Sequence, residues 1–320
     1  MNFIATGIGA GLVSALLTVV VVKETMLAVL LAMLAPLPVL IVALGWNHRS
    51  GLVATVIGGL AIAVFTASPI SAIGFVVITG LPAWWLAYLA LLGRPAADGT
   101  IEWYPIGRLL GWVAATAALT IIATGIISSG GDYSVFQSRS RQISEAFVTM
   151  FFEAPEQGTE NVRESLTETL ATMAPALSAF GFTFFMGLYL WLAAKVVSAS
   201  GRLPRPWPPV PGLEMPRTVL WALPAAFILT QFEGFAGALG YALFGALLMA
   251  FTLQGLAVIH DRTQGKPGRG FILVGLYTLL FLTQGIMITA LSFFGFADTI
   301  FGFRRRFGGN KPKQPPTLST

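Results

Sequence analysis

The longest uncharged stretch of the chain, residues 50–93, sets the strongest constraint on its fold. No Asp, Glu, Lys or Arg occurs within it. About 20 consecutive apolar residues are enough for one helix to cross the hydrocarbon core of a bilayer, and this stretch is too long for a single crossing. Ser68 and Pro69 interrupt it. We therefore predict a tight hairpin of two transmembrane helices, over residues 51–67 and 70–92.

The rest of the chain has the same apolar character. Hydrophobic residues make up 55% of the 320 residues and charged residues 10%, against roughly 25% charged in a typical soluble domain, and the mean hydropathy is +0.77. Lipid must therefore surround most of the molecule. We predict an all-α polytopic bundle of about nine transmembrane helices, with eight as the alternative. The apolar runs are residues 4–22, 26–44, 51–67, 70–92, 106–128, 171–197, 218–232, 236–260 and 270–294.

One segment, residues 129–170, departs from this apolar pattern. Between Asp132 and Glu168 lie seven acids and three arginines, so that this stretch carries −4 and the remainder +9. Ile143, Phe147 and Phe151 share one helical face, and a second apolar stripe follows the turn APEQGTEN. We expect two amphipathic helices that lie along the membrane interface or, as we prefer, cap the mouth of the bundle. The chain then divides into a five-helix region 1–128, the amphipathic segment 129–170, a second transmembrane region 171–306 and a disordered tail 307–320.

The basic residues between the spans predict how the bundle is oriented. Nine spans place most of them in loops on the side of the N-terminus, which favours a cytoplasmic N-terminus. The same count leaves the closing arginines 304–306 outside, against the rule. Either the short run 218–232, which contains Pro224, fails to cross or the last segment re-enters. The loops on the N-terminal side carry Arg49, Arg94, Arg108, Lys195, Arg202, Arg205, Arg217, Arg262, Lys266 and Arg269, and the opposite loops carry Lys23, Arg139, Arg141 and Arg163.

Polar groups and helix breaks inside the apolar runs are candidate binding positions, because each is costly in hydrocarbon. Pro36 and Pro38 remove two backbone donors and either kink their helix or break it, and a broken helix can line a cavity. Gln254 and Gln284 lie inside adjacent apolar runs and could face each other. There an amide either joins helices by hydrogen bonds or contacts a ligand.

Ionisable residues near the ends of the runs form a second group of candidates. His260 and Asp261 end a span, where they mark the water boundary or, as a pair, relay protons and contact a ligand. Asp298 and Arg304 are six residues apart, which predicts an ion pair that anchors the end of the chain at the headgroups.

The first apolar run begins with a dense set of small residues. Gly7 and Gly11 form a G-x-x-x-G pair, and Ala5 and Gly9 extend the pattern. Small residues at this spacing let a second helix approach closely. That helix belongs either to this chain or to a partner protein.

Several classes of function find no support in the sequence. No G-x-S-x-G, H-E-x-x-H, P-loop or Rossmann glycine motif is present, so we expect neither an enzyme nor ATP hydrolysis by this chain. The chain has no cysteine and only two histidines, far apart, which argues against a metal centre or another cofactor. The basic residues lie in short loops rather than in a patch on a folded aqueous surface, so we expect no nucleic-acid partner.

Three stretches, PLPVLIVALGWNHRSGL, LQGLAVIHDR and GFADTIFGFRRR, carry a resemblance to a known family. With them the chain resembles the YybS-like bacterial membrane proteins, a family catalogued as a domain of unknown function. That family is in turn similar to the substrate-binding (S) components of energy-coupling-factor transporters, although this chain has more predicted spans than those components. The resemblance implies a solute-binding protein of a bacterial inner membrane, and helix docking on an energising module through Ala5, Gly7, Gly9 and Gly11.

Our leading interpretation is a solute-binding or transport-related bundle in the lipid bilayer, with an unknown small-molecule substrate. Its cavity would lie between the break at Pro36 and Pro38 and the helices of Gln254 and Gln284. The alternative is a structural or assembly membrane protein without a ligand, in which the polar residues only join helices. A polar-lined cavity of roughly 300 Å³ or more at the membrane midplane would favour the first interpretation, and glutamines bonded within a solid core would favour the second.

Overall fold

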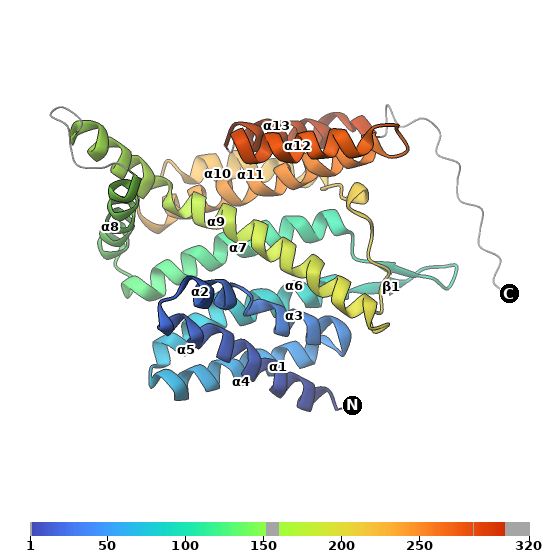
Figure 1. Ribbon diagram of the computed structural model, residues 1–320, viewed down its shortest axis with the longest axis horizontal. Coiled ribbons are helices and arrows are strands. Elements are labelled where there is room, and N and C mark those ends of the chain that lie inside the picture. Colours follow the sequence, from blue (N-terminus) through green and yellow to red (C-terminus); the bar gives the residue numbers. More distant parts are fainter. Residues whose placement is uncertain (1, 152–159, 284, 305–320) are drawn as a thin grey trace.

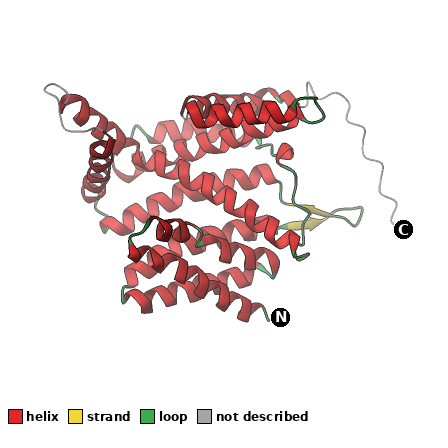
Figure 2. Ribbon diagram, viewed as in Figure 1, coloured by secondary structure: helices red, strands yellow, loops and turns green. Residues whose placement is uncertain are grey.

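The computed structural model describes residues 2–151, 160–283 and 285–304. This part of the chain is helical apart from one small hairpin of two strands and the loops (Figure 2). The elements are α1 (Phe3–Val19), α2 (Met26–Met33), α3 (Pro36–Gly45), α4 (His48–Thr66), α5 (Pro69–Phe75), α6 (Leu81–Ala90), β1 (Gly93–Pro95), β2 (Ile101–Trp103), α7 (Ile106–Ser129), α8 (Tyr133–Phe151), α9 (Glu160–Ala199), α10 (Ala222–Leu229), α11 (Gly234–Thr263), α12 (Arg269–Thr283) and α13 (Gly285–Phe301).

Seven helical segments of the described chain are long and apolar enough to cross a membrane. They are α1 with its 3-10 extension, α2 with α3, α4, α5 with α6, α7, α9 and α11. They lie side by side, with α1 and α4 at one edge and α10 to α13 at the other (Figure 1). The main core joins both halves of the chain, because most of its side chains come from α3, α6, α7, α9 and α11 and most of them are alanine, leucine or valine. The all-α polytopic bundle is thereby confirmed.

Local sequence explains where the predicted hairpin over residues 51–67 and 70–92 divides. The hydroxyl of Ser68 accepts a hydrogen bond from the backbone N–H of Ser71 at 3.3 Å, and Pro69 occupies the first turn of α5. A short polar cap followed by proline is typical of a helix start. The chain resumes as α5, passes through a π-helical turn at Val76–Gly80 and continues as α6.

The last predicted span, residues 270–294, is instead a hairpin of two short helices, α12 and α13. The α13 helix runs in the same direction as α11, because Thr252 donates to the carbonyl of Ile288 at 3.3 Å and Arg262 donates to the carbonyl of Phe303 at 2.8 Å. The α12 helix must therefore run back along α11, where Tyr277 reaches His260. The segment re-enters and ends on the side from which it started.

The run 218–232 is also not a regular span. It consists of a 3-10 turn at Arg217–Trp221 and the eight-residue α10, preceded by an extended segment, residues 203–216, that we call the strap. The strap and α10 together connect the end of α9 to the start of α11. Seven helical segments, together with the strap and α10, carry the described chain from one end of the bundle to the other eight times, against the nine spans predicted.

An even number of crossings resolves the conflict over the closing basic residues. Asn2 and Arg304, the first and last described residues, both lie on the side that carries the β1–β2 hairpin, the strap and the loop after α11 (Figure 1). We call this the basic side, and the end with α8 the acidic side. Arg304 joins the other basic residues there, and arginines 305 and 306, with the tail 307–320, lie outside the described residues.

The structure of the amphipathic segment, residues 129–170, differs in part from the sequence prediction. The second expected amphipathic helix is not separate, because α9 runs for 40 residues from the acidic side into the core and through the span. In α8 two residues of the expected apolar face point outward, with Ile143 exposed by 72% and Phe147 by 54%, while Ser140, Ser144 and Val148 are buried. The arrangement places α8 beside the first turns of α9 at the bundle mouth.

The topology can be tested with single cysteines, because the chain has none of its own. We expect Asp98→Cys, Lys266→Cys and a cysteine appended after Thr320 to react with an impermeant maleimide only after the cells are permeabilised. Gln142→Cys on α8 should react in intact cells. Labelling of the appended cysteine in intact cells would contradict the hairpin of α12 and α13.

Candidate functional site

A cavity of about 360 Å³ opens at the acidic side between α8, α9 and α11. Its volume falls within the range of small-molecule sites. Polar and aromatic side chains line it. It lies at the mouth of the bundle, not at the midplane beside Pro36, Pro38 and Gln254, where the sequence predicted a cavity. The lining residues are Tyr133, Ser134, Phe136, Gln137, Ser138, Ser140, Arg141, Glu168, Ala171, Thr172, Pro175, Phe232, Gly237, Ala238 and Tyr241.

The first turns of α8 supply most of the polar wall. Asp132 starts this helix by accepting a hydrogen bond from the backbone N–H of Ser134 at 2.8 Å and one from its hydroxyl at 2.8 Å. The helix then places residues 133, 134, 137, 138, 140 and 141 along the cavity. Hydroxyl and amide groups both donate and accept hydrogen bonds. This wall can therefore recognise a small polar molecule.

An aromatic cluster closes the cavity toward the core. The ring of Tyr133 lies 5.8 Å from that of Phe136 and 5.3 Å from that of Phe235, between ring centres. Burial raises the pKa of the Tyr133 hydroxyl, and Tyr241 and Glu233 raise it further. Tyr133 therefore remains a neutral hydrogen-bond donor over a wider pH range. Phe136 fits against α7 because Gly125 has no side chain, and a Cβ there would lie 2.8 Å from the Phe136 ring.

The opposite wall is formed by a proline inside α9. Pro175 has no N–H and cannot donate to the carbonyl of Ala171 one turn earlier, and both residues line the cavity. The carbonyl of Ala171 therefore lacks its usual helical donor and remains available as an acceptor. Beyond the proline, α9 and α11 touch closely, because Gly245 lies against the carbonyl of Ala176, where a Cβ would collide.

The charged residues of the cavity differ in their pairing. Arg141 donates from Nη2 to Glu164 Oε1 at 3.2 Å, in an exposed ion pair. The backbone carbonyl of Glu168 accepts a hydrogen bond from the hydroxyl of Thr172 at 3.0 Å. Within the described residues, the Glu168 carboxylate takes part in none of the ion pairs. The site thus combines hydroxyls and aromatic rings with one carboxylate.

Gln254, the most prominent of the predicted binding residues, lies elsewhere and is fully buried. Its Oε1 accepts a hydrogen bond from the backbone N–H of Met215 at 3.0 Å. Its Nε2 donates to Asp298 Oδ2 at 3.1 Å and to the hydroxyl of Thr299 at 2.8 Å. These bonds join α11, α13 and the strap. Both ends of the amide are used by protein groups, as expected if Gln254 joins helices.

The predicted ion pair between Asp298 and Arg304 is present and belongs to the same network. Arg304 Nη2 lies 2.8 Å from Asp298 Oδ2, and the two side chains are exposed by only 10% and 2%. Arg304 also donates from Nη1 to the carbonyl of Pro211 in the strap at 2.8 Å. The pair therefore lies inside the bundle rather than among the headgroups. Asp298 Oδ1 has no hydrogen-bond partner among the described residues.

The other predicted residues are not brought together with Gln254. Pro36 and Pro38 fall in the first turn of α3, so the helix is broken there, and the hydroxyl of Ser14 donates to the adjacent carbonyl of Ala35 at 2.5 Å. His260 Nδ1 lies 3.0 Å from the carbonyl of Leu256, within one helix. Gln284 lies outside the described residues, and Asp261 is half-buried.

The small residues of α1 divide between two faces. Gly7 and Gly11 are buried against α4, where a Cβ would meet the carbonyls of Ser50 at 2.7 Å and Ala54 at 2.5 Å. Ala5 and Gly9 are exposed, and a Cβ at Gly9 would meet nothing within 4 Å. The first pair packs the chain against itself, whereas the second faces outward.

The network around Gln254 can be tested by its effect on stability. Gln254→Leu leaves the Met215 N–H without its partner, whereas Asp298 keeps Arg304 and Thr299 keeps the carbonyl of Gly295. The orphaned buried N–H costs about 1–3 kcal/mol. We expect a clear fall in the melting temperature of the detergent-purified protein. Gln264→Leu, in the exposed turn after α11, serves as the control and should melt like the wild type. If the wild type, Gln254→Leu and Gln264→Leu had the same melting temperature, Gln254 would not be the residue that joins α11, α13 and the strap.

Comparison with known proteins places the chain in a family. A family model described as predicted membrane protein (DUF2232) matches residues 12–299. No curated protein and no solved structure matches the chain. The match covers nearly all of the bundle, from α1 to the end of α13. The chain therefore belongs to the DUF2232 family of multi-pass membrane proteins.

Proposed function

We propose that this protein binds a small polar solute at the acidic side of the membrane, as a transport-related component without its own ATPase. The observation that carries the proposal is the cavity beneath α8, which combines a sufficient volume with hydroxyl groups and aromatic rings. The binding residues differ from those expected from the sequence. They come from α8, the part of α9 around Pro175 and the start of α11.

The cavity indicates the chemistry of the solute. Tyr133, Ser134 and Gln137 offer donors and acceptors along one wall, and the carbonyl of Ala171 offers an acceptor on the other. A planar or ring-shaped molecule can pack against the aromatic cluster. The carboxylate of Glu168 favours a neutral or positively charged group over an anion. We infer a small solute that is rich in hydrogen-bonding groups and carries no net negative charge.

Uphill transport would require energy from elsewhere, because the sequence contains no P-loop. The outward face of α1 with Ala5 and Gly9 offers a place where a partner helix can approach closely. This suits docking on an energising module, as the resemblance to S components implies. The basic side would face the cytoplasm of a bacterium and α8 its exterior. No chemical reaction is proposed, because the cavity needs only to bind and release its solute.

A structural or assembly role remains the second candidate, and the network around Gln254 favours it. This network explains the most unusual polar residues of the spans as links between α11, α13 and the strap. A purely structural role does not explain the cavity on the acidic side. The two candidates therefore differ over that cavity alone.

A pair of threonines on α9 provides a matched test. Thr172 and Thr169 each donate to a carbonyl one turn earlier, at 3.0 and 2.8 Å, but only Thr172 lines the cavity. We would screen neutral and cationic metabolites for thermal stabilisation of the detergent-purified protein. A solute that stabilises the wild type should also stabilise Thr169→Trp but not Thr172→Trp, because the indole fills the cavity.

Two results would count against solute binding. One is a screen in which none of the metabolites stabilises the wild type. The other is a stabilising compound that acts equally on both tryptophan variants, since it would then bind outside the cavity. Either result would favour the structural role. Tyr241→Phe adds a finer measure, because it removes one hydroxyl while keeping the ring.

A further inference from the structure

A second cavity, also of about 360 Å³, lies near the basic side between α7, α9, α11, α12 and the strap. Its walls are almost wholly apolar and include Val113, Leu253 and Trp207. Gly187 on α9 leaves part of this space empty, since a Cβ there would meet only Leu253 Cδ1, at 3.8 Å. The cavity therefore suits a hydrocarbon group rather than a polar solute.

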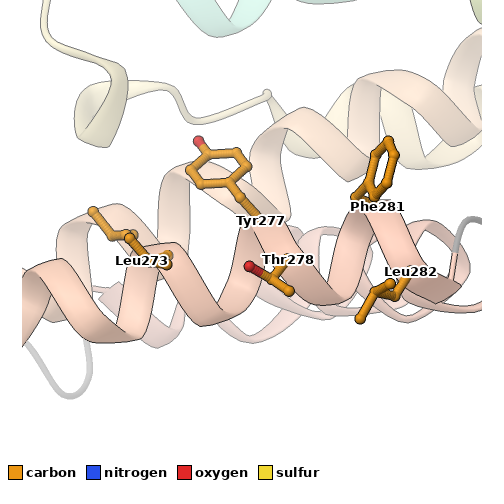
Figure 3. Close-up of a pocket in the computed structure, with 6 residues that line it drawn as sticks. Leu273, Tyr277, Thr278, Phe281 and Leu282 are labelled. Atoms are coloured by element: carbon orange, nitrogen blue, oxygen red, sulfur yellow. The ribbon is translucent and has the colours of Figure 1, made fainter.

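Two walls of this cavity continue onto the outer surface of the bundle. Trp191 of α9 is exposed by 37% and Tyr277 of α12 by 50%. Every residue of α12 is at least partly exposed, and Figure 3 shows Leu273, Tyr277 and Phe281 projecting from one side of this helix. Apolar surface at this depth contacts lipid. The cavity is thus open sideways to the bilayer, which is its natural source of a ligand.

The rim toward the basic side is polar and positively charged. Lys195 lies one turn beyond Trp191 on the same face of α9, with Nζ 5.8 Å from the Trp191 ring centre. Tyr277 and His260 lie within hydrogen-bonding distance of each other, at 3.4 Å between the hydroxyl and Nε2. Aromatic and basic residues together are typical of the level of the lipid headgroups.

We propose that this cavity is a specific site for an anionic phospholipid of the basic-side leaflet. One acyl chain enters between α9 and α12 and lies against Leu253 and Trp207. The phosphate remains at the rim, beside the ammonium group of Lys195. The cavity on the acidic side is a separate site, so this inference does not depend on the proposed solute.

The part of the cavity that would hold the acyl chain can be tested by filling it with a larger side chain. We would measure binding of phosphatidylglycerol to the detergent-purified protein by native mass spectrometry. Gly187→Leu should weaken binding by about tenfold, because each displaced methylene group contributes several-fold to affinity. Gly181→Leu is the control on the same helix, where a Cβ would meet nothing within 4 Å, and it should bind like the wild type. Equal binding by both variants, or equal loss in both, would overturn the proposal.

The headgroup part has an independent test that leaves the interior unchanged. Lys195→Gln should reduce the preference for phosphatidylglycerol over phosphatidylcholine by about fivefold, the effect of one basic residue near the membrane surface. Lys266→Gln removes a charge from the loop after α11 on the same side and should leave the preference unchanged. Equal binding of the two lipids by the wild type, or equal effects of the two lysine variants, would overturn the assignment of an anionic lipid.

Discussion

The structure depends on hydrogen bonds to the backbone of the strap, which has no regular helix although it lies among the transmembrane helices. The strap runs beside α7, α11 and α13 without a regular hydrogen-bond ladder, and its groups find partners in the surrounding helices. Gln254 accepts from Met215, Arg304 donates to Pro211, and Arg205 donates to the carbonyl of Ala90 at 2.8 Å. Each unsatisfied group would cost several kcal/mol in hydrocarbon, on the order of magnitude known for amides. These polar side chains are therefore what permits an extended segment inside the bundle.

The fold class followed from the sequence because hydropathy reports directly on the solvent of a helix. The break at Ser68 and Pro69 was also predictable, since cap and proline act locally. The direction in which the chain runs through residues 270–294 was not predictable. Residues 270–294 have enough apolar length for one span, and the same composition suits two short helices in lipid. Only the packing of α13 along α11 distinguishes the two, and that contact is between distant parts of the chain.

The candidate site was missed for a related reason. Rare polar residues in apolar runs attract attention, and Gln254 is the clearest of them, yet its hydrogen bonds are all within the protein. The cavity on the acidic side is built from serines, tyrosines and a glutamine in a segment where such residues are ordinary. One available signal was Pro175, a proline within an apolar run. Its partner residues on α8 and α11 could be located only by the fold.

The hairpin of α12 and α13 has a consequence for the membrane itself. It accompanies α11 only from about Thr252 onward, toward the basic side. One half of α11 is therefore flanked by α12 and α13, whereas the half toward the acidic side is flanked by α10. The two leaflets of the bilayer meet different helices along this edge of the bundle.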